Sequence, residues 1–229
     1  MRLGIKNQAS LFFLRSPFTI FAPVNRYMFM NNTDIKFSEN VVLLDVAFLN
    51  GWVSNVRQIM GERLGRELPR LDLVEWLTCL LLDAGVRGEG NEVQVLLLHA
   101  AGGDKKLACC VPDSLAELDG KACATPLGEF SFACVTAEGL ATDEHLYFDL
   151  LTLLLNSENL KTLLLLPSAE VADEKLEDLM VQAKKDMGAG AEKNLQCTHW
   201  FRMAPPEHEL PCQWCLVIYS LAYMLDINF

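Results

Sequence analysis

The sequence lacks the short signatures that identify common enzyme sites. It contains no GxGxxG or Walker A phosphate loop, no GxSxG nucleophile motif and no HExxH pair. Its four histidines show none of the spacings with which His and Cys bind zinc. No motif therefore supports a nucleotide-binding enzyme, a serine hydrolase or a zinc peptidase.

Basic residues and long apolar runs are also scarce. Nineteen Lys and Arg stand against 30 Asp and Glu, which gives a net charge of −11. Because an acidic surface repels phosphate backbones, binding of nucleic acid through a broad basic face is disfavoured. No apolar run reaches the roughly 18 to 20 residues needed to cross a bilayer, so we expect no membrane span. The 229 residues, 51% of them hydrophobic, are enough for a sizeable core.

Paired CxxC arrays are absent, although the chain has eight cysteines. Several lie in apolar stretches, where a free thiol packs as a small hydrophobic group. We therefore expect reduced cysteines and a cytoplasmic location. Cys212 and Cys215 form an isolated CxxC after a proline-rich loop rather than after a strand, which does not favour redox chemistry there.

The first 30 residues differ from the rest in composition. They carry four basic residues and no acid. We interpret residues 1–30 as a disordered leader or an over-extended gene start, with an export signal as the alternative. We expect residues 31–229 to form a single α/β domain, because no change in composition divides them.

Alternating apolar runs and helical patterns predict the fold class. Short apolar or mixed runs predict strands at Val41–Phe48, Glu92–His99, Gly128–Val135, Leu160–Leu166 and Leu195–Met203. Helical spacing predicts helices at Gly51–Leu64, Asp72–Ala84, Thr142–Asn156, Asp173–Lys185 and Pro211–Leu225. We expect Lys105–Val111 to return antiparallel as a small β-hairpin insertion, and Met187–Ala191 to form a turn. The alternation predicts a three-layer α/β domain with a mostly parallel sheet flanked by helices.

An acid at the end of the first predicted strand is the main functional clue. Asp45 follows a buried apolar run, and Asn50 comes five residues later. Open α/β sheets bind ligands at the carboxyl ends of their strands. Carboxylate and amide oxygens suit a divalent metal such as Mg²⁺ or Mn²⁺. The alternative is that Asp45 caps the turn that follows it.

Two further acids are candidates for the same site. Asp149 lies in a mostly apolar helix, and Glu170 follows the strand that ends at Leu166. If both carboxylates converged on Asp45, the three could hold a metal for hydrolysis. The alternatives are that Asp149 lies on the solvated stripe of its helix, and that the acids near Glu170 cap the next helix.

Several stretches resemble a family of uncharacterised bacterial proteins of unknown function. They are VVLLDVAFLN, DLVEWLTCLLLDAGV, NEVQVLLLHA, PLGEFSFA and the Leu-rich strand at 160–166. The resemblance extends from Val41 to the C-terminus. It implies no activity.

More distantly, the order of elements is similar to that of the NYN branch of the PIN-like nuclease superfamily. That resemblance implies a Rossmann-like sheet and acids that bind magnesium or manganese for RNA cleavage. Asp45 and Asn50 match the acid and the amide after the first strand, although the usual DGxN reads DVAFLN here. Asp149 matches an acid on a later helix. The sequence PSAE stands where the family has an SGDSD-like run, so Glu170 is its only partial substitute.

These observations favour a PIN/NYN-like domain with a non-catalytic binding or scaffold role toward a protein partner. The acid set is incomplete and no basic stripe is present. The alternative is a metal-dependent nuclease or phosphohydrolase that uses Asp45, Asn50, Asp149 and Glu170 with Mg²⁺ or Mn²⁺. An exposed sheet edge or the apolar C-terminal helix is where we would expect contacts in any oligomer.

Overall fold

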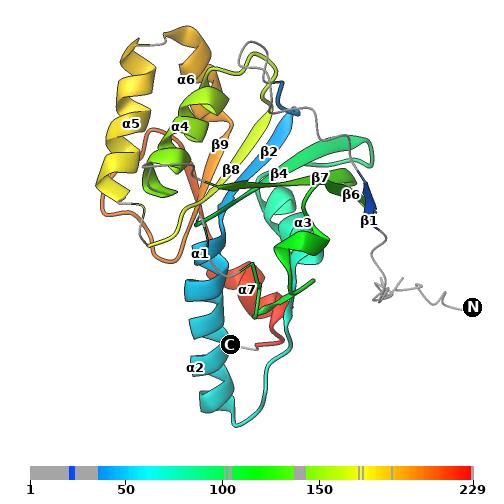
Figure 1. The fold of residues 1–229 in the computed structure, drawn as a ribbon. Coiled ribbons are helices and arrows are strands. Elements are labelled where there is room, and N and C mark those ends of the chain that lie inside the picture. Colours follow the sequence, from blue (N-terminus) through cyan, green and yellow to red (C-terminus); the bar gives the residue numbers. More distant parts are fainter. Residues whose placement is uncertain are drawn as a thin grey trace, which may run out of the picture.

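A computed structural model describes residues 21–23, 36–100, 102, 105–136, 143–169, 171, 173–186 and 188–227. Within these residues an eight-stranded sheet lies between two layers of helices (Figure 1). Its strands run in the order β1-β6-β7-β4-β2-β8-β9-β10. In chain order they are β1 (Phe21–Pro23), β2 (Asn40–Asp45), β4 (Asn91–His99), β6 (Lys121–Thr125), β7 (Gly128–Thr136), β8 (Thr162–Leu166), β9 (Thr198–Arg202) and β10 (Gln213–Leu216).

The centre of the sheet is parallel. Strand β2 pairs in parallel with β4 on one side and with β8 on the other. Strand β7 extends the parallel order beyond β4, and β9 and β10 extend it beyond β8. The antiparallel pairings in the described sheet are those of β6 with β7 and of β1 with β6, at one end, so β6 alone runs against the other strands. The predicted α/β class with a mostly parallel sheet is confirmed.

Helices cover both faces of the sheet. They are α1 (Val46–Phe48), η2 (Leu49–Val53), α2 (Ser54–Leu64), α3 (Leu73–Asp83), η3 (Leu115–Glu117), α4 (Asp143–Leu155), α5 (Asp173–Asp186), α6 (Ala189–Gln196) and α7 (Ile218–Met224). Helices α4, α5 and α6 pack on one face, and α3 and α7 on the other (Figure 1). In the part of the chain that the structure describes, no helix has the length and apolarity needed to cross a bilayer.

The two faces explain why β2 is apolar without interruption. Val42 and Leu44 belong to the core on the α3 side, while Val41 and Leu43 belong to the core on the α4 side. Successive side chains of a strand point to opposite faces, so a strand covered on both sides needs apolar residues at every position. All four side chains are fully buried.

Two predicted helix ends are also confirmed. Asp72 is the N-cap of α3, and its carboxylate accepts a hydrogen bond from the backbone N–H of Glu75 at 3.0 Å. Gly65 ends α2 in the left-handed conformation, with φ of 62°. A residue with a Cβ is strained in that region, which explains the glycine.

The predicted hairpin at Lys105–Val111 is wrong. Only β5 (Cys110–Val111) forms a strand there, and it pairs in parallel with β3 (Leu71–Asp72) in a separate two-stranded sheet. The antiparallel hairpin consists of β6 and β7 instead, and β7 belongs to the main sheet because its other edge pairs with β4. The tight turn at 126–127 therefore makes the hairpin that we expected earlier in the chain.

Three boundaries also differ from expectation. The first strand ends at Asp45 rather than near Phe48, because Asp45 caps α1. The predicted helix at Pro211–Leu225 is replaced by β10 and the short α7, because Gln213–Leu216 pairs with β9. The expected turn at Met187–Ala191 overlaps α6, which begins at Ala189. Of the predicted leader, residues 1–30, all but β1 lies outside the described residues.

Candidate functional site

Asp45 lies where the order of strands reverses. From β2 the chain adds β4 and β7 on one side, then β8, β9 and β10 on the other. In open α/β sheets, ligands bind outside the carboxyl ends of the strands at this reversal. Asp45 is only 7% exposed there, and its Oδ1 accepts a hydrogen bond from the backbone N–H of Ala47 at 2.9 Å. Its carboxylate therefore forms the cap that was the alternative to a metal ligand.

Tyr147 fills the space beside Asp45. This side chain of α4 is fully buried, and its hydroxyl donates to the carbonyl oxygen of Leu43 at 3.4 Å. Burial, and then the negative charge of Asp45, raise the pKa of Tyr147 well above its ordinary value. The phenol is therefore neutral at physiological pH and acts as a packed core side chain.

Asn50 and Asp149, the two other predicted site residues that the structure describes, do not gather around Asp45. The Asn50 side chain is exposed on η2, and its Nδ2 donates to the carbonyl oxygen of Lys106 at 3.1 Å. Asp149 is exposed on α4, two positions after Tyr147. Two positions turn a helix by about 200°, so Asp149 lies on the face away from Tyr147 and the sheet.

Glu170 lies outside the described residues. Among the residues whose placement is described, no group of three His, Cys, Asp or Glu side chains is arranged to hold a metal ion. The assignment of Asp45, Asp149 and Glu170 to a metal stays a prediction.

Arg202 organises a charged cluster at the same edge of the sheet, at the end of β9. Its Nη2 lies 2.9 Å from Oδ2 of Asp173, and its Nη1 lies 3.9 Å from Oε1 of Glu177. The guanidinium also stacks over the Trp200 ring at 4.3 Å from the centroid. The cluster ties β9 to the first turns of α5. Sequence reasoning missed it, although the charge at the end of the predicted strand was a visible signal.

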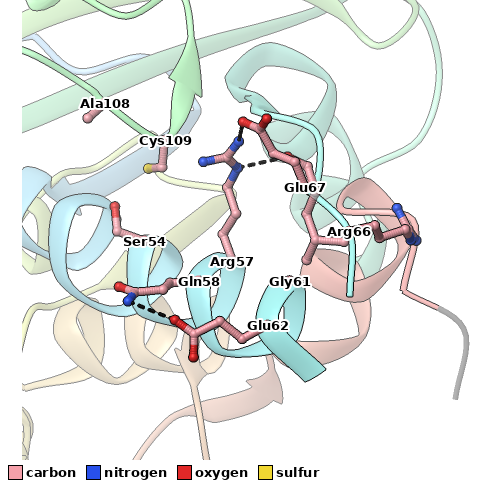
Figure 2. Close-up of a pocket in the computed structure, with 10 residues that line it drawn as sticks. Ser54, Arg57, Gln58, Gly61, Glu62, Arg66, Glu67, Ala108 and Cys109 are labelled. Atoms are coloured by element: carbon pink, nitrogen blue, oxygen red, sulfur yellow. Dashed lines mark hydrogen bonds and ion pairs between the residues drawn. The ribbon is translucent and has the colours of Figure 1, made fainter. Parts of the chain in front are cut away.

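A pocket of about 430 Å³ lies beyond the carboxyl end of β2, between α2 and the segment that leads into β5 (Figure 2). Its lining residues are Ser54, Arg57, Gln58, Gly61, Glu62, Arg66, Glu67, Leu68, Ala108 and Cys109. Several of the charged and amide side chains among them are exposed, so they form the rim. The pocket is therefore polar on its α2 side and carries a thiol on the other.

Arg57 is held in place across this pocket. Its Nε donates to the carbonyl oxygens of Leu68 and Pro69, both at 3.0 Å, and its Nη2 lies 3.0 Å from Oε1 of Glu67. Figure 2 shows the guanidinium between Glu67 and Cys109. A fixed cation beside a thiol favours the ionised form of that thiol.

Cys109 and Cys110 place two thiols side by side. The Sγ atoms are 3.4 Å apart, and the Cys109 thiol also lies 3.3 Å from the carbonyl oxygen of Leu49. The hydrogen bond from Cys110 lowers the pKa of Cys109 to about 7 against the opposing effect of burial, with help from the Ser54 hydroxyl and the Arg57 charge. The Cys110 pKa is raised, because the neighbouring thiol and burial both keep its proton bound. Of the two thiols, Cys109 is the one whose ionisation is favoured.

Sequence reasoning missed this pair as a site. It treated cysteines in apolar stretches as small buried hydrophobic groups, and both residues are indeed buried. The visible signal was the CC dipeptide itself at 109–110. Its partners on α2 are more than 50 positions earlier in the chain, so local patterns do not reveal them.

Comparison with known proteins gives one match. No curated protein and no solved structure matches the chain. Residues 34–229 match the family described as "Family of unknown function (DUF6621)", a span that includes β2, the pocket and the charged edge. This confirms the resemblance to a family of unknown function. Because the match covers most of its length, the chain belongs to the DUF6621 family.

Proposed function

We propose that this domain is a non-catalytic binding module that holds a protein partner through α2. The observation that carries the proposal is the exposure of α2. The helix extends away from the sheet (Figure 1), and none of its 11 residues is buried. Helices in globular domains normally bury an apolar stripe, so a projecting helix with apolar side chains in solvent is suited to contact another molecule.

Two of the three exposed apolar side chains on and just before α2 share one face, and the third, Leu64, lies on another side of the helix. Trp52, just before α2, is 41% exposed, and Ile59 is 50% exposed. Seven positions are two helical turns, so the two side chains lie on the same side. Anchors at this spacing are how a helix binds an apolar groove, and Trp is enriched among the residues that dominate binding energy.

Partly buried side chains next to Trp52 and Ile59 keep the helix in position. Val56 and Met60 pack against a small cluster of Leu68, Ala222, Leu225 and Ile227. A helix that is already held in its binding conformation loses less entropy when it binds. This supports α2 as a preformed recognition element rather than a segment that orders on contact.

The carboxyl edge of the sheet supports a non-catalytic role. Asp45 is used as a cap, and the fully buried Tyr147 packs beside it. Counted from β2, the parallel strands have the spatial order 3-2-1-4-5-6, which supports our proposal of a Rossmann-like, PIN/NYN-like fold. In such a sheet ligands bind at the carboxyl edge, and a domain with a non-catalytic role can use that position for core side chains instead.

Two further proposals concern organisation and location. We propose that residues 31–229 form one domain, preceded by a leader at residues 1–30 of which only β1 (Phe21–Pro23), paired with β6, is placed against the sheet in the described residues. All eight cysteines are free thiols, which supports a reducing, cytoplasmic location.

The test is a pull-down that compares which proteins of a native extract bind to three immobilised full-length chains. The first is the wild type, and the second is the Trp52→Ala/Ile59→Ala variant. The third is a Leu153→Ala/Val181→Ala control, which removes two comparably exposed side chains from α4 and α5. We expect a protein that the wild type and control retain and the α2 variant loses, and roughly tenfold weaker binding of that purified protein by the α2 variant. The same proteins in equal amounts on all three chains would exclude α2 as the binding element.

A further inference from the structure

The pocket beside α2 ends on a pair of adjacent thiols. Cys109 is one of its lining residues, whereas Cys110 lies behind it and is fully buried. The 3.4 Å between the two Sγ atoms needs to close to about 2.05 Å to form a disulfide, which is a small movement of two side chains. Ser54 and Arg57, both in the pocket lining, lie on the α2 side of Cys109 (Figure 2).

We propose that Cys109 and Cys110 are a peroxide-sensitive modification site, in which Cys109 reacts with a peroxide in the pocket and Cys110 converts the product to a disulfide. The proposal does not depend on α2 binding a partner. It rests on a cavity lined by Cys109, a fixed cation and a second thiol within reach, which are features of redox-sensing cysteines. Because Cys109 is only 2% exposed, a peroxide has to reach it through the pocket.

The reaction uses both thiols and one hydroperoxide. The Cys109 thiolate attacks one peroxide oxygen, an S–O bond forms, the O–O bond breaks, and the leaving oxygen takes a proton to become water or an alcohol. Cys109 is now a sulfenic acid. The Cys110 sulfur then attacks the Cys109 sulfur, the S–S bond forms, and the S–O bond breaks. The departing hydroxide takes the Cys110 proton and leaves as water. Two thiols are oxidised by two electrons, and the peroxide is reduced.

The site has a built-in preference for the reduced state. Adjacent Cα atoms are about 3.8 Å apart, which is below the usual 4.4–6.8 Å of disulfide-bonded residues. A disulfide between neighbours is therefore strained and easily reduced. Forming it would also disturb the pairing with β3, because the Leu71 N–H donates a hydrogen bond to the Cys109 carbonyl oxygen at 2.8 Å. We expect oxidation to be reversible and to alter the wall of the pocket.

The test uses the reduced full-length chain and hydrogen peroxide. Trypsin cleaves after Lys106 and Lys121, and the released peptide contains Cys109 and Cys110 and no other cysteine. After oxidation we expect the mass of this peptide to be lower by two hydrogens, and its thiols to be unreactive toward alkylating agents. The rate of this oxidation should exceed that of Cys123 and Cys134, which share the next tryptic peptide, by roughly tenfold or more. A thiol reductant should restore the two free thiols.

Two variants separate the roles of the thiols. Cys110→Ser should stop the reaction at a sulfenic acid on Cys109 that a dimedone probe labels. Cys109→Ser should abolish the rapid phase. The proposal is overturned if, in the folded wild type, the peptide with Cys109 and Cys110 is oxidised no faster than that with Cys123 and Cys134, a result that needs no variant to fold. It is also overturned if dimedone labels Cys110 rather than Cys109.

Discussion

The carboxyl edge of the sheet and the pocket beside α2 make an instructive comparison. Both hold polar side chains beyond the end of β2, and both include a group with a shifted pKa. Burial and the charge of Asp45 raise the pKa of Tyr147, whereas the hydrogen bond from Cys110 lowers the pKa of Cys109. At the sheet edge, Asp45 caps a helix and Tyr147 fills the space beside it. At the pocket, Arg57 and Cys109 border an open volume. A polar residue at a strand end thus becomes a candidate site only where packing leaves space in front of it.

The largest effect that would test this contrast is the removal of the side chain that fills the sheet edge. We expect Tyr147→Ala to lower the free energy of unfolding by about 3–5 kcal/mol, because it leaves a cavity in a close-packed core. Tyr147→Phe should cost only about 1 kcal/mol, since it removes a single hydrogen bond to Leu43. Urea denaturation measures both. A loss below about 1 kcal/mol for Tyr147→Ala would show that the edge is loosely packed and open to a ligand.

A smaller effect is expected at Asp45, and it tests the metal-dependent alternative. Loss of an N-cap costs about 0.5–2 kcal/mol, so Asp45→Ala should destabilise the protein by that amount. The matched control is Asp149→Ala, at an exposed helix position, which should change stability by less than about 0.5 kcal/mol. In a Mn²⁺ calorimetric titration we expect the wild type and both variants to give the same heats. Binding by the wild type that Asp45→Ala loses would instead support the hydrolytic reading.

The parts of the fold that follow from local chemistry are predictable from the sequence. The interiors of strands β2 and β8 are unbroken apolar runs because both of their faces are covered. The start of α3 is predictable because Asp72 is a preferred N-cap residue and directly precedes the apolar run of the helix. The apolar residues of β10 fit helical spacing and predict a helix, yet pairing with β9 decides the conformation of this segment. Long-range pairing of this kind overrides local preference.

The same distinction holds for the candidate sites. The position of Asp45 at the end of a strand was predictable from the run of apolar residues before it. That Tyr147 packs beside it depends on how α4 is rotated against the sheet, which the nearly all-apolar sequence of α4 does not specify. The pocket requires α2 to meet a segment about 50 residues later, so only the folded chain brings Arg57 to Cys109.

The lowered pKa of Cys109 can be tested by measuring how the alkylation rate of this thiol depends on pH. A thiol with a pKa lowered to about 7 becomes a thiolate as the pH rises through 7. Its alkylation rate should therefore rise about tenfold per pH unit below 7 and level off above it. Cys123 and Cys134, whose burial raises their pKa values to about 11 and 12, should still be accelerating well above that pH.

Substituting the charged residue that faces Cys109 tests what causes the lowered pKa. Arg57 faces Cys109 from α2, and Arg70 and Asp72 act on Cys110 from the segment around β3. Replacing Arg57 with Met should move the plateau to higher pH, whereas Arg57→Lys should keep it closer to the wild type because the charge remains. A Cys109 profile parallel to that of Cys123 in the wild type would show that the pocket does not activate the thiol.

The smallest effect on stability is expected at the exposed side chains of α2, where it separates binding from folding. Trp52→Ala/Ile59→Ala should change the free energy of unfolding by less than about 1 kcal/mol per site, because about half of each side chain is already exposed to water. Met60→Asp should destabilise by more than that, because it places a charge against the apolar cluster that includes Leu225. Thermal unfolding of the two variants gives the comparison. If Trp52→Ala/Ile59→Ala proved as costly as Met60→Asp, Trp52 and Ile59 would be holding α2 to its own domain and would not be available to a partner.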